Sequence, residues 1–344
     1  MSVLIRSRAP LRIGLAGGGT DIIPYIENHT GAVICTAIDR YAYVTLRPIS
    51  QKIFKVHSQD YNLQEIFQRI SDLKYDGKLD LIKAGFRTLG FGEQGFDITL
   101  HADVPPGSGL GSSSAVAVAL VGSLFQFANR VLSSYEVADL AIKIERVELG
   151  LKGGLQDQYA SAFGGFNFIE FKKDSVIVNP LRLRPQITCE LLASMLLLDT
   201  GTTRLSGDIL SREIEGYKNK DSNIVENLHH IKKLAYEMKD SIVKGDLRSV
   251  ADILHQSWIH KKNLDKSISN SEIDDLYDTA KREGALGGKL LGAGGGGHLL
   301  LICDPDKKDS IAKEMTKKGC KIVNFNFDSE GLQTWRLHEN KVVV

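Results

Sequence analysis

The sequence predicts a mixed α+β fold, and three observations support this class. Apolar strand-like stretches and helix-like stretches with a 3.6-residue period alternate in both halves of the chain. Three glycine-rich segments interrupt them: the first glycine segment (residues 9–21), the phosphate loop (residues 105–115) and the last glycine segment (residues 289–297). The 344 residues are enough for two domains. The same alternation also allows an α/β fold, which the pattern leaves open.

The first half of the chain contains strands and two well-marked helices. The predicted strands cover residues 3–16, 32–48 (one strand or two), 96–102 and 163–171. Pro105 stops the strand before the phosphate loop, and this loop leads into an apolar helix over residues 113–129. A second helix begins at a capping box made by Ser133 and Glu136 and ends at Gly150.

The second half begins after a short basic stretch between two prolines, Pro180 and Pro185. We predict a domain boundary there, which gives domains of residues 1–182 and 183–344. Beyond it we expect a strand at residues 191–198, helices through residues 207–283 and a strand at residues 298–303.

Composition excludes several classes of function. The formal net charge is +1, so a nucleic-acid or anionic-membrane partner has no support. The four cysteines are far apart without a C-x-x-C pair, which is typical of reduced structural thiols. No apolar run reaches the ~20 residues of a membrane span, and no signal peptide is apparent. We therefore expect a cytoplasmic protein; its oligomeric state does not follow from the sequence.

The phosphate loop has the sequence PPGSGLGSSSA. Glycines let backbone N–H groups approach an anion, and the helix that follows offers further free N–H groups and a favourable dipole. The serine hydroxyls could contact phosphate oxygens or Mg²⁺. A flexible turn with serine caps is the structural alternative.

The other two glycine segments are less informative alone. The first glycine segment, APLRIGLAGGGTD, could hold a polar ligand, or it could be a tight turn in which Asp21 caps a helix. The last glycine segment, KLLGAGGGG, contains a literal G-x-G-x-x-G. A dinucleotide site needs a helix after this pattern, but a strand is predicted here, so an oxidoreductase is disfavoured.

In this order, the three segments resemble the motifs of the GHMP kinase superfamily, which includes galactokinase, homoserine kinase and mevalonate kinase. The phosphate loop resembles its ATP-binding motif, and the resemblance covers nearly the whole chain. It implies a ribosomal-S5-like N-terminal domain and a ferredoxin-like C-terminal domain, with the active site between them. It also implies ATP and Mg²⁺ as cofactors. A non-catalytic sugar sensor on the same fold is a competing class, but the phosphate loop and the acidic residues are intact.

The resemblance implies roles for four residues. Asp157 resembles the aspartate proposed as the base in galactokinases, although from the sequence alone it could simply begin a helix. Glu145 resembles the Mg²⁺-ligating glutamate, with Ser113 or a neighbouring serine as its partner; otherwise Glu145 is a surface charge. Arg12 matches the basic residue beside the catalytic aspartate, or it is a packed strand residue. His298 is expected to be a rim or core histidine.

The remaining predicted contacts form two groups. The ATP-binding group is Pro105, Gly107, Ser108, Gly109, Leu110, Gly111, Ser112, Ser113 and Ser114. The substrate-binding group is Gly18, Gly19, Thr20, Asp21, Gly294, Gly295 and Gly296. Within it, the Asp21 carboxylate could accept hydrogen bonds from two hydroxyls of a sugar.

The acceptor is suggested by departures from the galactose and mevalonate branches, which carry G-E-H where this chain has GGGTD. With residues 154–167 and 284–297, the pattern resembles the branch that phosphorylates the anomeric hydroxyl of D-glycero-D-manno-heptose 7-phosphate, for nucleotide-activated heptose synthesis. Another sugar 1-kinase, fucokinase- or galactokinase-like, is the alternative. A distal phosphate would need cations; the candidates, each otherwise a surface charge, are Lys152, Arg182, Arg184 and Arg204.

Overall fold

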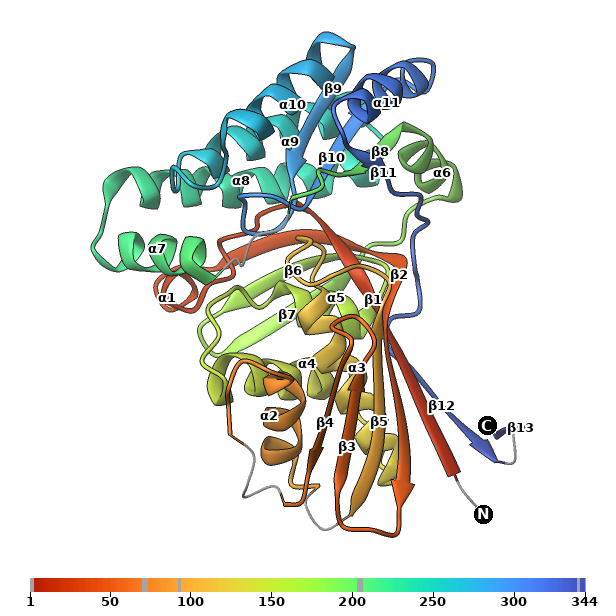
Figure 1. Cartoon of the computed structure of the whole chain (residues 1–344). Coiled ribbons are helices and arrows are strands. Elements are labelled where there is room, and N and C mark those ends of the chain that lie inside the picture. Colours follow the sequence, from red (N-terminus) through yellow and green to blue (C-terminus); the bar gives the residue numbers. More distant parts are fainter. Residues whose placement is uncertain (1–2, 70–73, 92–93, 203–206, 339–340, 344) are drawn as a thin grey trace.

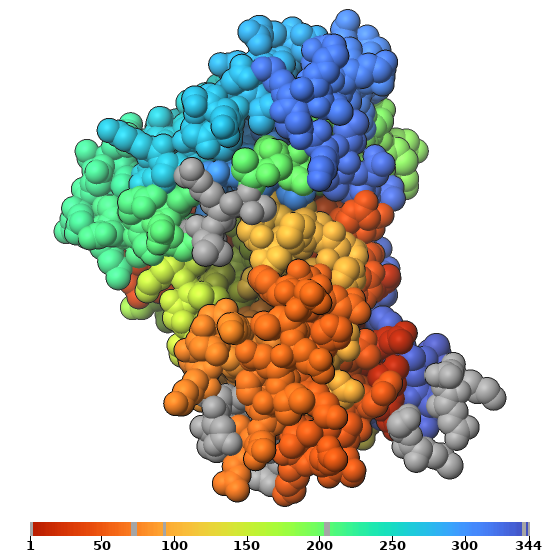
Figure 2. Space-filling model, in the orientation of Figure 1, coloured from red at the N-terminus to blue at the C-terminus, as the bar shows by residue number. Residues whose placement is uncertain are grey.

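The protein is described by a computed structural model covering residues 3–69, 74–91, 94–202, 207–338 and 341–343. A large sheet and its helices form the lower body in Figure 1, and a small sheet with long helices forms the upper body. Figure 2 shows the surface of the molecule from the same side, with the two bodies in contact. Both bodies mix helices and antiparallel strands, which confirms the predicted α+β class.

The large sheet has nine strands in the order β13-β12-β1-β2-β5-β3-β4, with β6 and β7 branching from β2. Among the strands that the structure describes, only β3 and β5 pair in parallel. The long β2 pairs with β6 through its first part and with β5 through its last part. The strands are β1 (Val3–Ala16), β2 (Gly31–Ile49), β3 (Phe54–Ser58), β4 (Leu63–Phe67), β5 (Gly95–Ala102), β6 (Phe166–Lys172), β7 (Ser175–Pro180), β12 (Gln333–His338) and β13 (Lys341–Val343).

Helices α3 and α5 pack against β1 and β2. They are apolar where they meet the sheet, and the resulting core includes Leu11, Ile13 and Leu120, all fully buried. The helices of this body are α2 (Asp80–Leu89), α3 (Ser112–Phe127), α4 (Ser134–Ile142), the π-helix η2 (Lys143–Glu148) and α5 (Gln156–Phe163). The short α1 (Ile23–Ile26), between β1 and β2, packs against the upper body.

The upper body holds a four-stranded sheet in the order β11-β8-β10-β9 and its own core around the fully buried Trp258. Ile22 and Tyr25, from the N-terminal part of the chain, belong to this second core. The elements are α6 (Pro185–Ser194), β8 (Met195–Asp199), α7 (Gly207–Lys218), α8 (Ser222–Lys244), α9 (Leu247–Lys262), α10 (Ser271–Arg282), β9 (Ala285–Leu290), β10 (His298–Cys303), α11 (Lys308–Lys317) and β11 (Lys321–Ile322).

Several predicted elements are confirmed. Strands β1 and β10 have the expected bounds, α3 and β5 begin within a residue of them, and the Ser133–Glu136 capping box is present. Across the described parts of the chain, no helix combines the length and apolar character needed to cross a bilayer.

Two predicted boundaries were wrong, and one predicted helix changes type along its length. The strand expected at residues 163–171 starts at Phe166, because α5 continues to Phe163 and ends at Gly164, whose φ is +66°. The strand expected at residues 191–198 starts at Met195, because Pro185 opens a helix there instead. The helix expected from Ser133 to Gly150 changes to a π-helix at Lys143.

Candidate active site

The phosphate loop joins β5 to α3 and exposes the start of that helix. Gly107, Gly109 and Gly111 have φ values of +80°, +79° and +78°, which L side chains rarely adopt. Gly111 precedes the helix, so the N–H groups of the three serines that follow form its first turn. These N–H groups have no partners within the helix and lie at the positive end of its dipole, which makes a binding site for phosphate.

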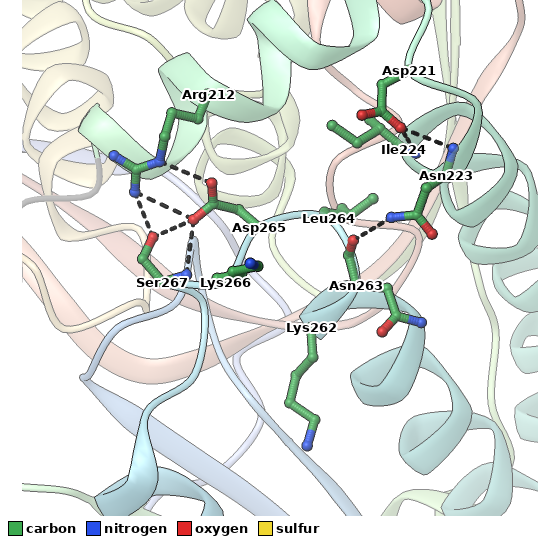
Figure 3. A pocket seen from close by; sticks show the side chains of 10 residues that line it. All are labelled: Arg212, Asp221, Asn223, Ile224, Lys262, Asn263, Leu264, Asp265, Lys266 and Ser267. Atoms are coloured by element: carbon green, nitrogen blue, oxygen red, sulfur yellow. Dashed lines mark hydrogen bonds and ion pairs between the residues drawn. The ribbon is translucent and has the colours of Figure 1, made fainter.

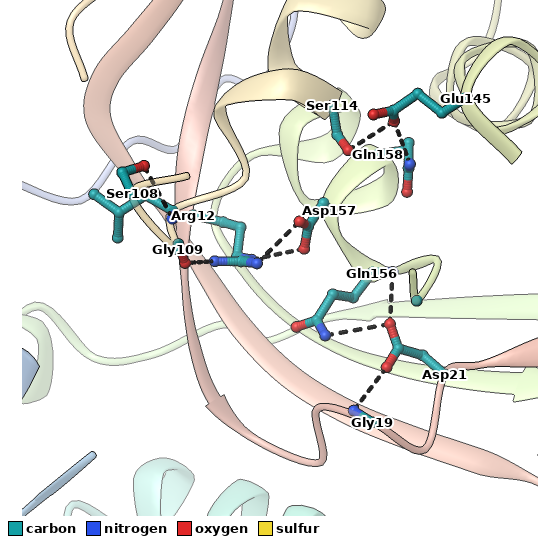
Figure 4. A network of polar contacts seen from close by, with 12 residues as sticks. Arg12, Gly19, Asp21, Ser108, Gly109, Ser114, Glu145, Gln156, Asp157 and Gln158 are labelled. Carbon is teal, nitrogen blue, oxygen red and sulfur yellow. Dashed lines mark hydrogen bonds and ion pairs between the residues drawn. The ribbon is translucent and has the colours of Figure 1, made fainter. Parts of the chain in front are cut away.

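Arg12 and Asp157 form an ion pair beside this loop (Figure 4). Arg12 Nε donates to Asp157 Oδ1 at 2.7 Å, and Nη2 donates to Oδ2 at 2.9 Å. Arg12 Nη1 also donates to the carbonyl of Gly109 at 2.5 Å. A Cβ built on Gly111 would lie 3.2 Å from Asp157 Oδ2. The carboxylate therefore lies directly against the phosphate loop, with its orientation fixed by a bidentate guanidinium.

Glu145 is almost fully buried, at 1% exposed, and is not the surface charge that the sequence alone suggested. Its Oε1 accepts from the Ser113 hydroxyl at 2.9 Å. Its Oε2 accepts from the Ser114 hydroxyl at 2.7 Å and from Gln158 Nε2 at 2.5 Å (Figure 4). Ser113 is exposed, whereas Ser114 is buried. Glu145 therefore places its Oε1 beside the accessible hydroxyl of Ser113.

This pair of oxygens fits Mg²⁺. Among the described residues no group of three or more His, Cys, Asp or Glu side chains could hold a metal. Mg²⁺ commonly takes only one or two protein oxygens, with phosphate oxygens and water completing its octahedron. Ser113 and Glu145 can supply such a pair at the edge of the phosphate loop.

Asp21, in the first glycine segment, is fully buried and strongly hydrogen-bonded. Its Oδ1 accepts from the Gly19 N–H at 3.0 Å, and its Oδ2 accepts from the backbone N–H and the side-chain Nε2 of Gln156 at 3.0 and 3.2 Å (Figure 4). A Cβ at Gly154 would lie 2.0 Å from Oδ2. Asp21 thus joins the first glycine segment to the start of α5, and Oδ1 keeps one lone pair for a ligand.

The last glycine segment is a β-hairpin loop between β9 and β10, so it lacks the following helix of a dinucleotide fingerprint. A Cβ on Gly292 would lie 2.6 Å from the Cα of Gly109. The loop therefore packs directly against the phosphate loop. His298, after it, is buried with Nδ1 2.8 Å from the Ser108 carbonyl, as expected for a core histidine. Burial lowers the pKa of His298.

These features line one cavity of about 1110 Å³ between the two bodies. It brings together most of the predicted site residues: Arg12, Gly18, Gly19, Asp21, Gly107, Ser108, Gly109, Gly111, Ser112, Ser113, Ser114, Glu145, Asp157, Gly294 and Gly296. Four predicted residues do not line it: Pro105, Leu110, Thr20 and Gly295. Leu110 is a buried core residue, and the Thr20 hydroxyl donates to the Gly17 carbonyl. The Gly295 N–H donates to the Ile268 carbonyl.

Sequence reasoning missed several polar residues of the cavity, among them Arg146, Gln156, Lys261 and Lys289. Gln156 and Arg146 are neighbours of predicted residues, so adjacency was an available signal. Lys289 stands at the first position of the last glycine segment. Lys261 lies in a helix with no motif around it, and nothing in the sequence distinguishes it from the other lysines.

A second hollow, of about 800 Å³, lies between α7, α8 and the end of α9 (Figure 3). Arg212 Nε donates to Asp265 Oδ2 at 2.8 Å. Burial acts to raise the pKa of Asp265, but the bonds from Arg212 and Ser267 outweigh it and lower that pKa to about 2. These groups satisfy one another and share no lining residue with the main cavity.

Known proteins match the chain at three levels. The model of the GHMP kinases N-terminal domain matches residues 79–165, and that of the GHMP kinases C-terminal domain matches residues 238–321. The D-glycero-alpha-D-manno-heptose 7-phosphate kinase of Campylobacter jejuni is 40% identical over 97% of this chain and 99% of its own length. The L-fucokinase/L-fucose-1-P guanylyltransferase of Bacteroides fragilis is 27% identical over 97% of this chain but only 38% of its own length.

The chain is also similar to a solved structure. The crystal structure described as a D-glycero-D-manno-heptose 1-phosphate kinase from Bacteroides thetaiotaomicron superposes with a TM-score of 0.81. It is 33% identical and covers 97% of this chain and 100% of its own.

Proposed function

Because the chain belongs to the GHMP kinase family, we propose that it transfers the γ-phosphoryl group of ATP to the anomeric hydroxyl of D-glycero-D-manno-heptose 7-phosphate. The product would be the 1,7-bisphosphate, a precursor of nucleotide-activated heptose. The full-length likeness to the Campylobacter jejuni enzyme is the observation that carries this acceptor. We place the reaction in the cytoplasm, where ATP is available.

In this proposal the phosphate loop binds the triphosphate of ATP. The N–H groups at the start of α3 contact its oxygens, and the glycines allow the backbone to approach them. Ser113 and Glu145 would hold Mg²⁺, whose charge would offset that of the phosphate oxygens. Gly294 and Gly296 border the same cavity from the opposite body, so the loop of the last glycine segment would contact the ligands there.

Asp157 would accept the proton of the attacking hydroxyl or orient that hydroxyl. Its carboxylate lies beside the phosphate loop, where an acceptor hydroxyl can approach a bound γ-phosphate in line. Arg12 holds this carboxylate through two hydrogen bonds and brings positive charge to the place where the transferring group passes. Asp21 and the backbone of Gly18 and Gly19 would bind the hydroxyls of the sugar.

A second acceptor follows from the Bacteroides thetaiotaomicron structure, whose description names heptose 1-phosphate as the substrate class of that protein. A sugar already phosphorylated at the anomeric position would then receive its second phosphate elsewhere. Fucose and galactose remain further alternatives, given the fucokinase relative.

The test is an ADP-release assay with heptose 7-phosphate, heptose 1-phosphate, unphosphorylated heptose, fucose and galactose. We expect the highest kcat/KM with heptose 7-phosphate, and phosphorus NMR of the product should show a new anomeric phosphate. Comparable or faster turnover of any other acceptor would refute the proposed substrate while leaving the sugar kinase assignment intact.

A further inference from the structure

Among the described residues, the buried amino group of Lys289 has no hydrogen-bond or ion-pair partner. It lies near the end of β9, its residue is 9% exposed, and it lines the main cavity. Within the described residues, its Nζ takes part in no hydrogen bond or ion pair. A buried ammonium group without an anion is costly. Its burial, helped by the nearby charges of Lys261 and Arg12, lowers the pKa of Lys289 to about 7.

Lys261 lines the same cavity from α9, near enough for its charge to act on Lys289. Its Nζ donates to Glu213 Oε1 at 2.6 Å, and the side chains of both residues are buried. An ammonium group has three N–H donors, so two remain for a ligand. A Cβ built on Gly19 would lie 3.7 Å from this Nζ. Lys261 therefore stands over the first glycine segment, on the side of the cavity proposed for the sugar.

Arg12, the other basic side chain near Lys289, already has hydrogen-bond partners. Arg12 gives two hydrogen bonds to Asp157 and one to the Gly109 carbonyl. Of these three side chains, Lys289 and Lys261 keep several N–H donors free. When both amino groups are protonated, they offer five free N–H donors in one cavity, which match the three terminal oxygens of a phosphate monoester.

We propose that Lys289 and Lys261 form the subsite that binds the phosphate group already carried by the acceptor. This inference rests on the proposed function, because it requires a phosphorylated sugar as the acceptor. It replaces the cations suggested by sequence: Lys152 lines the cavity but is exposed, Arg182 and Arg184 are exposed between β7 and α6 and do not line it, and Arg204 lies outside the described residues.

The test compares heptose 7-phosphate with unphosphorylated heptose as acceptors for the wild-type enzyme and three variants. Lys289→Met removes the unpaired cation and leaves no buried partner behind. Lys261→Met is combined with Glu213→Gln, so that no unpaired carboxylate remains. Lys262→Met is the matched control, because Lys262 is adjacent on α9 but bonds Asp274 and does not line the cavity.

We expect Lys289→Met and the double variant each to lower kcat/KM for heptose 7-phosphate by about 10- to 100-fold. Their kcat/KM for unphosphorylated heptose and their KM for ATP should stay within about threefold of wild type. Lys262→Met should match wild type with both acceptors. Circular dichroism and thermal unfolding identify a variant that fails to fold, and Lys289→Gln then takes its place.

Three results would overturn the inference. If Lys289→Met slows both acceptors equally, the lysine acts on the transferring phosphoryl group. If the wild-type preference for the phosphorylated sugar persists in both variants, the two lysines do not bind that phosphate, while the proposed function stands. If wild type itself shows no such preference, the proposed acceptor fails and this subsite fails with it.

Discussion

Arg12 and Asp157 form the ion pair on which the proposed chemistry depends. The guanidinium fixes both oxygens of the carboxylate and also contacts the phosphate loop through Gly109. Arginine suits this position, because its planar fork binds a carboxylate with two parallel hydrogen bonds and stays charged. Lysine could not reproduce both bonds.

Asp157→Asn tests the role of the carboxylate. The amide keeps the shape but loses the proton-accepting oxygen, so we expect kcat to fall by about 10²–10⁴ with ATP binding nearly unchanged. Steady-state kinetics and nucleotide titration measure the two quantities. Arg12→Met should likewise lower kcat more than ATP affinity. A folded Asp157→Asn enzyme with near wild-type turnover would exclude the role.

Ser113→Ala and Glu145→Gln test the metal pair. Because each change removes one proposed ligand oxygen, both variants should need more Mg²⁺ for half-maximal activity, by about tenfold. Ser114→Ala is the matched control, since Ser114 is buried and bonds the other oxygen of Glu145. A shifted Mg²⁺ titration for Ser114→Ala alone would move the ligand by one residue.

Lys289 should make stability depend on pH. Burial lowers its pKa from 10.5 to about 7, so between these values the unfolded chain binds a proton that the folded chain has released. The free energy of unfolding contributed by this residue therefore rises with pH across the window, by up to about 1.4 kcal/mol per pH unit.

Urea unfolding of wild type and Lys289→Met at pH 7, 8 and 9 measures this effect. The variant should be more stable at pH 7, and its advantage should shrink as the pH rises. Lys262→Met, measured in parallel, should show a difference from wild type that does not change with pH. A pH-independent difference for Lys289→Met as well would contradict the shifted pKa.

At the scale of elements, the site depends on two glycine loops in direct contact. The phosphate loop belongs to the lower body and the last glycine segment to the upper body, and they meet at Gly109 and Gly292. Neither loop has room for a side chain at this contact. The hairpin between β9 and β10 therefore supports the phosphate loop as well as bordering the cavity.

Gly109→Ala tests this contact. The new Cβ would lie 2.4 Å from the Leu291 carbonyl oxygen, so the loops must separate, and we expect ATP affinity to fall by about 10- to 100-fold. Gly90→Ala is the matched control: its φ is +75°, but no atom lies within 4 Å of the added Cβ. The control should lose only about 1–2 kcal/mol of stability and keep its ATP affinity.

At the scale of the whole molecule, the chain crosses between the two bodies more than once. The division predicted at residue 182 falls between β7 and α6, and after β11 the chain returns to the large sheet, where β12 pairs with β1. This returning segment also touches α3, because a Cβ on Gly122 would lie 2.8 Å from the Leu332 side chain. The end of the chain thus supports the helix that begins at the phosphate loop.

Deletion of residues 324–344 should expose the edge of β1 and remove this support. We expect the free energy of unfolding to fall by about 3 kcal/mol or more, with a matching loss of soluble protein, measured by urea unfolding and fractionation. Deletion of residues 341–344 removes only β13, beyond β12, and should cost less than about 1 kcal/mol. Equal stability of both deletions would show that β12 is dispensable.

Local signals in the sequence were enough for much of the fold. Strand β1 follows from its apolar run, α4 from its capping box, and the phosphate loop from the order of strand, proline, glycines and apolar helix. Each signal acts between residues close in the chain, through backbone geometry or periodic burial. The same locality explains the errors at Phe163 and Leu191, where helices α5 and α6 continue or begin on residues that suit a strand equally well.

The sequence by itself therefore determined the fold class, the phosphate loop and, through resemblance, the predicted roles of Asp157 and Glu145. The tertiary structure decided which side chains come together: Arg12 bonds Asp157, 145 positions away, and Lys289 on β9 lines the same cavity as Lys261 on α9. It also decided that Glu145, in a π-helical turn, is buried. These contacts join distant segments, and burial depends on every element packed around a residue, so no local pattern specifies them.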